Sequence, residues 1–311
     1  MRGYVPLLLL LAAIWGASFM FIKIAVDELA PTTTMALRLV LSAIPLLAII
    51  ILNRGLRPAL SEMRSITRAA MFLGIVSTAL PFTLIAWGET KIDSGVAAIG
   101  NASMPIFVAA LAIKFRASER ATGSRLFGVM LGLLGVAVLT GVNPEGGWAG
   151  VAGTLAVVVA SISYAVATLY TQGLLDNVHN DVLAAASVTW GAIFLTPLGA
   201  VQAPSHFPSW GVVAAVLALA LLGTVAGQLL YFRLIYRYGS ARASLVVYLL
   251  PVTALFYGAL LLNEPITTSA IVGLVLILTG TALARACCAC RTELRSPPRR
   301  ERDDSRRRIS T

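Results

Sequence analysis

The chain has 311 residues, of which 58% are hydrophobic and 12% are charged, and its mean hydropathy is +0.85. Soluble globular domains have about 45 to 50% apolar and 25% charged residues, so the composition excludes a soluble protein. The formal net charge of +10 would suit a nucleic-acid-binding protein, but the placement of the charges along the chain, described below, argues against that class.

Ten stretches of the chain are long and apolar enough to cross a bilayer as helices. A spanning helix needs about 20 mostly apolar residues, whereas a β-barrel strand needs about 10 residues of alternating polarity. These runs are continuously apolar, so helices are predicted. In chain order the segments are 5–26, 32–52, 67–88, 95–115, 124–142, 149–171, 182–202, 210–232, 240–262 and 267–288.

The Lys and Arg residues lie almost entirely on one side of this predicted bundle. Of the 24, the termini and inner loops on that side carry 21, Lys91 falls on the other side, and Lys23 and Arg38 lie inside segments. The positive-inside rule makes the rich side cytoplasmic. Both termini are therefore predicted to be cytoplasmic, although one inner loop, QGLLDNVHND (172–181), carries no Lys or Arg.

The C-terminal residues 289–311 mix charged residues with two prolines and no apolar stretch, which predicts a disordered basic cytoplasmic tail. Three cysteines, Cys287, Cys288 and Cys290, lie at the inner end of the last segment without a nearby His. A disulfide or a zinc site is not supported on that reducing side. Small packing residues and reversible acylation are both left open for them.

An internal repeat is visible in two blocks of the chain. SGVAAIGNASMP (94–105) aligns with SARASLVVYLLP (240–251) at an offset of 146, which places Pro105 over Pro251. The pattern E-x-x-T-x5-G-x6-G recurs at an offset of 145, as Glu119, Thr122, Gly128, Gly135 and again as Glu264, Thr267, Gly273, Gly280. Two blocks in the same order at nearly one offset indicate a duplicated unit of five helices.

Because five is odd, the second copy must enter the membrane from the opposite face. The predicted fold is an all-α membrane protein with ten transmembrane helices arranged as two inverted five-helix repeats. We expect a first repeat at 1–142, an external linker at 143–148, a second repeat at 149–288 and the tail at 289–311. Inverted repeats are a recurring architecture of secondary transporters, and Pro105 and Pro251 are the hinge candidates.

Three stretches resemble the paired repeats of EamA-type carriers in the drug/metabolite transporter superfamily: WGASFMFIKIAV…PTTTMALRLVLSAI, SGVAAIGNASMPIFVAALAIKFRASERAT and GSARASLVVYLLPVTALFYGALLLNEPITTSAIVGLVLILTG. The resemblance covers residues 5–285. It implies a ten-helix carrier whose central cavity is lined chiefly by helices 1, 3, 4, 6, 8 and 9 and which exports amino acids or other metabolites. Asn101 departs from the family pattern, which is usually apolar there.

The charged residues inside the segments are cations. All 14 Asp and Glu residues fall in loops, at helix ends or in the tail, which argues against the efflux of organic cations through an intramembrane carboxylate. Lys23 is expected to reach outward to water. Arg38 is expected to pair with Asp27, Glu28 or helix-end carbonyls and so hold helices 1 and 2 together, with contact to an anionic substrate group as the alternative.

Polar groups within the segments are the candidates for a substrate cavity, since such sites are mostly apolar with a few fixed polar groups. Simple packing and bonding to the residue's own helix are the competing interpretations. Trp15 and Tyr164 correspond across the repeat at an offset of 149. The candidates are Trp15, Ser18, Thr83, Trp87, Asn101, Ser103, Ser163, Tyr164, Thr168, Gln228, Ser244 and Tyr248.

Two further features favour structure over chemistry. Glu119 and Glu264 lie at helix boundaries, where capping and turn formation are favoured over proton coupling. Gly128, Gly132 and Gly135 form a small face suited to close helix packing.

Secondary transport is the predicted function: export of amino acids or other small polar metabolites across the cell membrane. We expect a small-molecule substrate, the lipid bilayer as partner, no nucleic acid, no cofactor, no metal and no catalytic residues, with the oligomeric state open. Efflux of neutral or amphipathic drugs is the alternative. A membrane-embedded enzyme is disfavoured, because both histidines fall in loops and no H-E-x-x-H occurs; the ATP-binding pattern G-x-x-x-x-G-K-[ST] is also missing.

Overall fold

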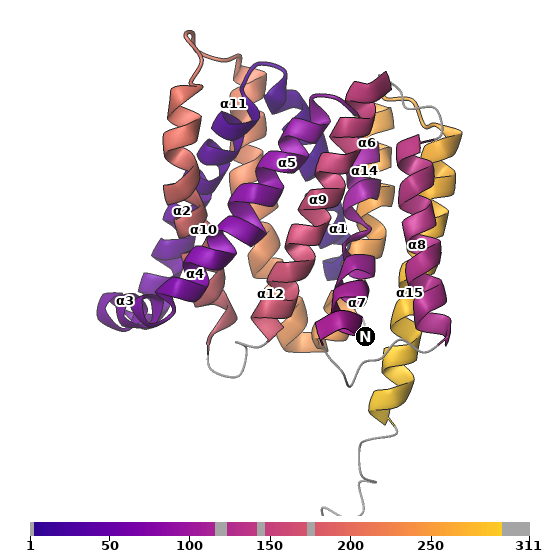
Figure 1. Ribbon diagram of the computed structural model, residues 1–311. Coiled ribbons are helices and arrows are strands. Elements are labelled where there is room, and N and C mark those ends of the chain that lie inside the picture. Colours follow the sequence, from indigo (N-terminus) through magenta and orange to yellow (C-terminus); the bar gives the residue numbers. More distant parts are fainter. Residues whose placement is uncertain (1–2, 116–122, 142–146, 173–177, 294–311) are drawn as a thin grey trace, which may run out of the picture.

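The computed structural model describes residues 3–115, 123–141, 147–172 and 178–293, and every regular element in these ranges is a helix (Figure 1). The elements are α1 (Tyr4–Val26), α2 (Pro31–Arg54), α3 (Leu56–Ser65), α4 (Thr67–Leu73), η1 (Gly74–Ala79), α5 (Leu80–Glu89), α6 (Ser94–Asn101), α7 (Met104–Phe115), α8 (Gly123–Gly141), α9 (Gly147–Gln172), α10 (Asn180–Val201), α11 (Trp210–Ala218), η3 (Leu219–Ala226), α12 (Gly227–Tyr238), α13 (Ser240–Ala243), α14 (Val246–Leu261) and α15 (Thr268–Glu293).

All ten predicted apolar stretches are helical. Seven are long and apolar enough by length and composition to cross a membrane, and the other three contain shorter apolar helices, Leu126–Thr140, Val246–Leu261 and Thr268–Leu283. Eight of the ten agree with the predicted ends to within two residues; the eighth extends to Tyr238 and the tenth to Glu293. The expectation that the disordered tail begins at 289 is therefore wrong for 289–293; residues 294–311 lie outside the described residues.

The sequence analysis treated residues 55–66 as a loop, which is wrong, because α3 occupies most of that segment. Its side chains are mostly exposed, and Ala59 is its one fully buried residue. A helix with such a narrow buried stripe suits the surface of a bundle, where one face is covered and the others are polar.

The outer surface of the bundle is apolar, which is what a lipid-facing surface requires. Exposed aliphatic side chains include Ile44 at 64% and Leu52 at 84%. Large exposed aromatic residues lie near helix ends, with Trp148 at the start of α9, Trp210 at the start of α11 and Tyr236 near the end of α12. Trp and Tyr are enriched at membrane interfaces, so the surface fits a bilayer rather than water.

The long helices stand side by side, and the beginning of α1 and the end of α15 lie at the same end of the bundle (Figure 1). Helix α8 packs along α15, α2 along α10, α1 along α14, and α9 along α5, α6 and α7. Each of these interfaces joins an element from the first half of the chain to one from the second. The two halves therefore form one interleaved core rather than two separate bundles.

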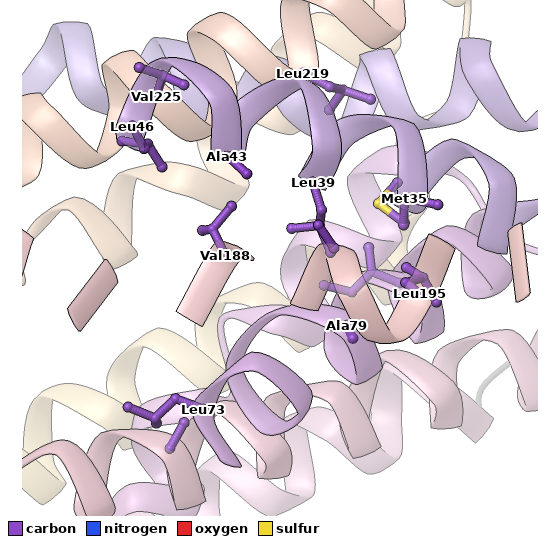
Figure 2. Close-up of a cluster of buried hydrophobic side chains, with 14 of the residues drawn as sticks. Met35, Leu39, Ala43, Leu46, Leu73, Ala79, Val188, Leu195, Leu219 and Val225 are labelled. Atoms are coloured by element: carbon purple, nitrogen blue, oxygen red, sulfur yellow. The ribbon is translucent and has the colours of Figure 1, made fainter. Parts of the chain in front are cut away.

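The largest apolar cluster surrounds α2. Met35 and Leu39 are fully buried there, and they lie among side chains of η1, α10 and η3 (Figure 2). Ala79 comes from η1, while Leu219 comes from η3. Helix α2 is therefore a central element that packs on η3 and α10, and α10 in turn packs on η1.

Glycines bring α8 and α15 into backbone contact, as the small face predicted. A Cβ atom on Gly280 would lie 2.5 Å from the nitrogen of Gly132 and 2.6 Å from the carbonyl oxygen of Gly128. A Cβ atom on Gly273 would lie 3.2 Å from the carbonyl oxygen of Gly135. The glycines of the two repeat blocks thus pack against each other, Gly128 with Gly280 and Gly135 with Gly273.

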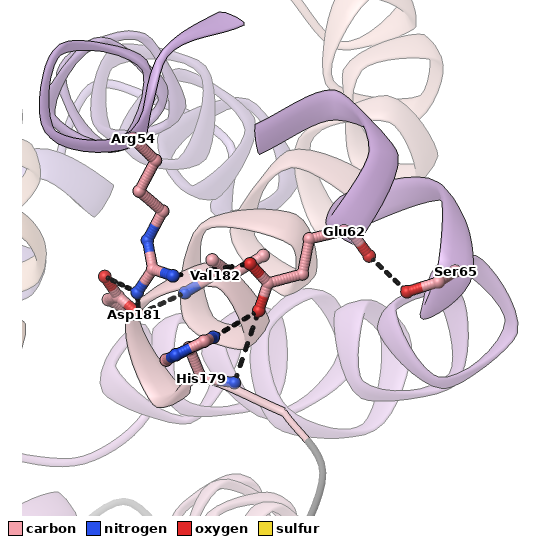
Figure 3. Close-up of polar contacts among 6 residues, drawn as sticks. All are labelled: Arg54, Glu62, Ser65, His179, Asp181 and Val182. Atoms are coloured by element: carbon pink, nitrogen blue, oxygen red, sulfur yellow. Dashed lines mark hydrogen bonds and ion pairs between the residues drawn. The ribbon is translucent and has the colours of Figure 1, made fainter. Parts of the chain in front are cut away.

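A polar cluster joins α2, α3 and α10 at one end of the bundle (Figure 3). Arg54 donates two hydrogen bonds of 2.9 Å to the carboxylate of Asp181, and it lies 3.4 Å from Glu62 Oε2. His179 Nδ1 lies 2.6 Å from the other oxygen of Glu62. These side chains are partly exposed, so each pair adds little stability, and the cluster serves mainly to fix α3 against the start of α10.

Candidate functional site

The third and eighth segments each contain a π-helical stretch, η1 and η3. Such stretches interrupt the α-helical hydrogen-bond register and occur frequently at functional sites. Side chains of other segments donate to backbone carbonyls of both stretches: Ser163 Oγ to Val76 O at 2.7 Å in η1, and Trp15 Nε1 to Gly223 O at 3.0 Å in η3, where Ala220 O also accepts from Ser42 Oγ. The two candidates Trp15 and Ser163 therefore hold the two irregular helices from α1 and α9.

Trp15 is fixed on several sides. Its ring lies 5.4 Å from that of Tyr231, and a Cβ atom on Gly227 would clash with its indole nitrogen. Ser18, one turn further along α1, is buried against Gly223 and donates to its own helix at Ile14 O. The structure thus brings Trp15 and Ser18 together against η3 and the beginning of α12.

Arg38 lies inside the bundle, with 7% of its surface exposed. Its Nε donates to Thr224 Oγ1 at 3.0 Å, and its guanidinium carbon lies 4.0 Å from the centre of the Phe82 ring. In the described part of the chain the guanidinium of Arg38 makes this hydrogen bond and no ion pair. The expected pairing with Asp27 or Glu28 is wrong, because the side chain turns away from that loop toward η3 and α5.

Phe82 connects Arg38 to a candidate on α9. The ring of Tyr164 meets that of Phe82 edge to face, with centres 6.4 Å apart. Ser18 and Arg38 both lie beside Gly223 of η3, so a row of side chains runs from Ser18 of α1 through Thr224 and Arg38 to Phe82 of α5 and Tyr164 of α9. Phe82 and Thr224 were not predicted from the sequence, since neither differs in type from many other residues of the spans.

Asn101 ends α6, where the fourth segment is broken before α7. Its side-chain Oδ1 is buried and has no hydrogen-bond partner, while its backbone carbonyl accepts from Ser161 Oγ at 3.4 Å. Ser103 Oγ lies in the break and donates to Gly100 O at 2.6 Å. A buried amide oxygen without a partner costs free energy, so a ligand that donates a hydrogen bond to Asn101 would be favoured.

The ninth segment is broken as well, between α13 and α14. Ser244 lies in this break and Tyr248 follows it in the first turn of α14, and both are half-buried. The hinge candidates take different positions relative to the breaks: Pro105 is the second residue of α7, whereas Pro251 lies inside α14. Proline cannot donate an intrahelical hydrogen bond, which fits the interruption just before Pro105, whereas α14 begins five residues before Pro251.

The remaining cavity candidates do not join the row. Thr83 and Thr168 donate to their own helices, at Ala79 O and Tyr164 O, each within 2.8 Å. Trp87 is 41% exposed. Gln228 is half-buried in α12.

Lys23 does not reach outward to water, so that expectation is wrong. Its ammonium donates to the backbone carbonyls of Glu89 and Ile92, at 2.8 and 2.9 Å. Cations at a helix C-terminus bind the free carbonyls and complement the helix dipole. Lys23 is therefore a cap that ties α1 to the end of α5.

Glu89 is the residue that the sequence analysis missed. It is the last residue of α5, and its side chain is completely buried, with both carboxylate oxygens lacking a hydrogen-bond partner. Glu89 lies at a helix end, as the sequence predicts for the acidic residues, but its complete burial was not predicted. The run GETKID has the composition of a polar loop. Its contacts with Lys23 of α1 and Gly153 of α9 come from residues far away in the chain, so the sequence alone does not show them.

Glu264 confirms the capping prediction. Its carboxylate accepts hydrogen bonds from the backbone nitrogen and the hydroxyl of Ser94, at 2.9 and 2.7 Å, and from Gly95 N. It therefore caps the beginning of α6 from the loop after α14. The equivalent residue in the other repeat block, Glu119, lies outside the described residues.

A helical bundle with an apolar surface, interrupted helices and a buried row of polar and aromatic side chains has the features of a multi-pass membrane transporter. The comparison with protein families agrees. The chain belongs to the EamA-like transporter family, whose model matches residues 3–141 and again residues 151–286.

Relatives from several organisms support the class. An uncharacterized transporter of Archaeoglobus fulgidus is 28% identical over 273 residues, covering 88% of this chain and 95% of its own. A probable amino-acid metabolite efflux pump of Salmonella typhimurium is 25% identical over 285 residues, which cover 88% of this chain and 92% of the pump. A solved crystal structure with 16% sequence identity has a TM-score of 0.63, covers 95% of this chain and 100% of its own, and shares the fold.

The family and these relatives are transporters rather than enzymes. Among the described residues, no group of three or more His, Cys, Asp or Glu side chains could hold a metal ion.

Proposed function

We propose that the protein is a secondary-active exporter of amino acids or other small polar metabolites in the cell membrane, working by alternating access between two inverted five-helix repeats with cytoplasmic termini. The observation that carries this proposal is the pairing of irregular helices. Segments three and eight each contain a π-helical stretch, and segments four and nine are each broken. Interrupted helices at corresponding places in two halves are the strongest structural pointer to a transporter's substrate site.

The glycine contacts between α8 and α15 support the repeat. Under the offset of 145, Gly128 corresponds to Gly273 and Gly135 to Gly280. Exchanging the two halves converts the contact of Gly135 with Gly273 into that of Gly280 with Gly128, and both contacts are present. Such reciprocity is expected where two equivalent helices meet across a two-fold axis, and it supports repeats at about 1–142 and 149–288 with a short linker between them.

Two polar groups suit a substrate with a carboxylate and a hydrogen-bond donor. The guanidinium of Arg38 carries N–H donors beyond its bond to Thr224, and Arg binds carboxylates through two parallel hydrogen bonds. The unpartnered Oδ1 of Asn101 can accept a hydrogen bond from an ammonium or hydroxyl group. An amino acid carries both functions, and two relatives bear the name of a probable amino-acid metabolite efflux pump.

Efflux of neutral or amphipathic drugs is a second candidate. The aromatic pairs of Trp15 with Tyr231 and of Phe82 with Tyr164 favour it, since such surfaces bind apolar rings.

Asn101→Ala tests the export function. In cells that overproduce the protein, we expect wild type to raise the concentration of at least one extracellular amino acid. The variant should reduce this export by about ten-fold at an equal amount in the membrane, because a lost hydrogen bond to a buried group costs about 1 to 3 kcal/mol. Mass spectrometry of the medium provides the measurement.

Thr140→Ala is the matched control, because Thr140 lies in α8, outside the interrupted helices, and its Oγ1 bonds to its own helix at Val136 O. It should export as wild type does. If wild type changes the medium content of no amino acid or polar metabolite, the exporter proposal fails. If a panel of neutral drugs is exported instead, the second candidate takes its place.

Cysteine labelling tests the orientation. After replacement of Cys287, Cys288 and Cys290, we expect Ser205→Cys to react with a membrane-impermeant maleimide in intact cells, while Ser65→Cys should react only in lysed cells. Both positions are exposed; Ser65 ends α3 and Ser205 lies in the loop after α10, on opposite sides of the predicted topology. Equal labelling of both in intact cells would contradict the inverted arrangement.

A further inference from the structure

Glu89 is an ionisable group with no structural duty in the state that the structure shows. Its side chain has 0% exposure, and neither Oε1 nor Oε2 has a hydrogen-bond partner. Its backbone carbonyl, by contrast, is bound by Lys23. The side chain therefore adds nothing to the capping of α5, and a neutral residue would cap equally well.

The groups around Glu89 come from four sides. Helix α1 provides Lys23, which is within 4 Å of backbone carbonyls but forms no ion pair with the carboxylate. Helix α2 provides Arg38, whose charge also acts on Glu89. Glu264, after α14, acts as a like charge, and its own oxygens are bound by Ser94 and Gly95 of α6.

The fourth side is apolar. The end of α5 packs closely on α9, where a Cβ atom on Gly88 would meet Gly153 O and Val157. No described hydrogen-bond donor therefore approaches the carboxylate from α9 or from the three charged neighbours. An ionised carboxylate in such a place is strongly disfavoured, and a buried group in this situation is neutralised instead.

We infer that Glu89 carries a proton and couples substrate export to proton entry. The O–H bond forms at Glu89 when the outer end of the bundle admits water, and the neutral carboxyl is then buried as the outer end closes. It breaks when the proton passes to water on the cytoplasmic side. Lys23 and Arg38 favour its release, since cations stabilise the carboxylate. This inference rests on the proposed transport function and adds to it the driving ion.

The linkage follows from burial. A conformation that encloses Glu89 without partners binds the proton more tightly than one that exposes it to water, so proton uptake and closure of the outer end favour each other by the same factor. An exporter that must take up an external proton to close after releasing its substrate is a substrate/proton antiporter.

The test uses the purified full chain in liposomes, with the twenty 15N-labelled standard amino acids as the probe and mass spectrometry as readout. In exchange without an ion gradient, wild type and Glu89→Gln should both take up label against an unlabelled internal mixture. With the vesicle interior more acidic than the medium, wild type should accumulate label as protons leave, and Glu89→Gln should lose this accumulation. Glu89→Gln keeps the shape and neutrality of a protonated Glu89, so it is expected to fold.

Glu28→Gln is the control variant. Glu28 is exposed after α1, and hydrogen bonds donated to its carboxylate by the side chain and the backbone N–H of Ser209 lower the pKa of this carboxyl below its ordinary value. It is therefore ionised in both states and should retain both exchange and accumulation when replaced.

Several results would overturn the inference. The first is that Glu89→Gln accumulates as much label as wild type. The second is that wild type accumulates label with a sodium gradient but not with a proton gradient. The third is that a pH gradient has no effect on uptake by wild type. Failure of wild type to exchange any amino acid would instead count against the proposed substrate class.

Infrared spectroscopy separates these two failures, because it needs no substrate. At neutral pH, wild type should show a protonated carboxyl band that Glu89→Gln lacks. A wild-type spectrum without this band would overturn the proton assignment even if transport is intact.

Discussion

Gly280→Ala is expected to destabilise the protein by about 1 to 3 kcal/mol, the usual cost of overpacking a close contact. The added methyl group would lie 2.5 Å from the backbone nitrogen of Gly132 and 2.6 Å from the carbonyl oxygen of Gly128. Backbone atoms of a neighbouring helix cannot rotate away as a side chain can, so α8 and α15 must separate. A lower midpoint of thermal unfolding in detergent would show this, and Gly280→Leu should prevent accumulation of folded protein.

Gly211→Ala makes the same chemical change at an open position. The nearest atom to its added Cβ would be Ser209 Oγ at 3.8 Å, an ordinary contact distance. Its unfolding midpoint should stay at the wild-type value, because substitutions away from such features usually change stability by less than about 0.5 kcal/mol. Equal midpoints for Gly280→Ala and Gly211→Ala would show that α8 and α15 are not in backbone contact.

The glycine interface is also where sequence reasoning succeeded best. The length and continuous apolarity of the segments predicted every long helix, because a chain in lipid must satisfy its own backbone and only helices do so within one segment. The small face of Gly128, Gly132 and Gly135 predicted close helix packing, and its contacts with Gly273 and Gly280 confirm it. Both features are encoded locally, in a few neighbouring residues.

The π-helical stretches could not be predicted in this way. GIVSTA at 74–79 and LALLGTVA at 219–226 have the composition of ordinary spanning helices. Their irregular backbones are stabilised from outside, by Ser163 on Val76 O and by Trp15 on Gly223 O. Those partners are 87 and 208 residues away in the chain, and a single sequence carries no direct record of such contacts.

The partners of the charged residues were missed for the same reason. The sequence places Lys23 and Arg38 inside segments correctly, but it predicts that Lys23 reaches water and that Arg38 pairs with the adjoining Asp27, Glu28 or helix-end carbonyls. In the folded bundle Lys23 binds carbonyls at the end of α5, and Arg38 reaches Thr224. In a compact bundle of many helices the nearest neighbours in space are seldom the nearest in sequence.

Arg38→Met separates a substrate-binding role of Arg38 from a structural one. Methionine is of similar length and apolar, and removing a buried cation spares an insertion cost of about 2.5 to 3.5 kcal/mol. The substitution removes the hydrogen bond from Arg38 to Thr224 and the contact with Phe82, but Thr224 keeps its own hydrogen bond to Leu219 O. We therefore expect the variant to fold with an unchanged or higher unfolding midpoint, as buried ion replacements often do.

Export should nevertheless fall by on the order of a hundred-fold, because loss of one partner in a buried charge pair with the substrate carboxylate costs about 2 to 5 kcal/mol. Arg68→Met, the same substitution at an exposed position of α4, should export normally. The opposite pattern, a lowered unfolding midpoint with full export for each folded molecule, would identify Arg38 as a clamp between α2, η3 and α5. The guanidinium retains N–H donors inside the bundle that no described side chain accepts from. A substrate carboxylate would bind these donors, whereas a clamp would leave them unpaired, so we expect the binding role.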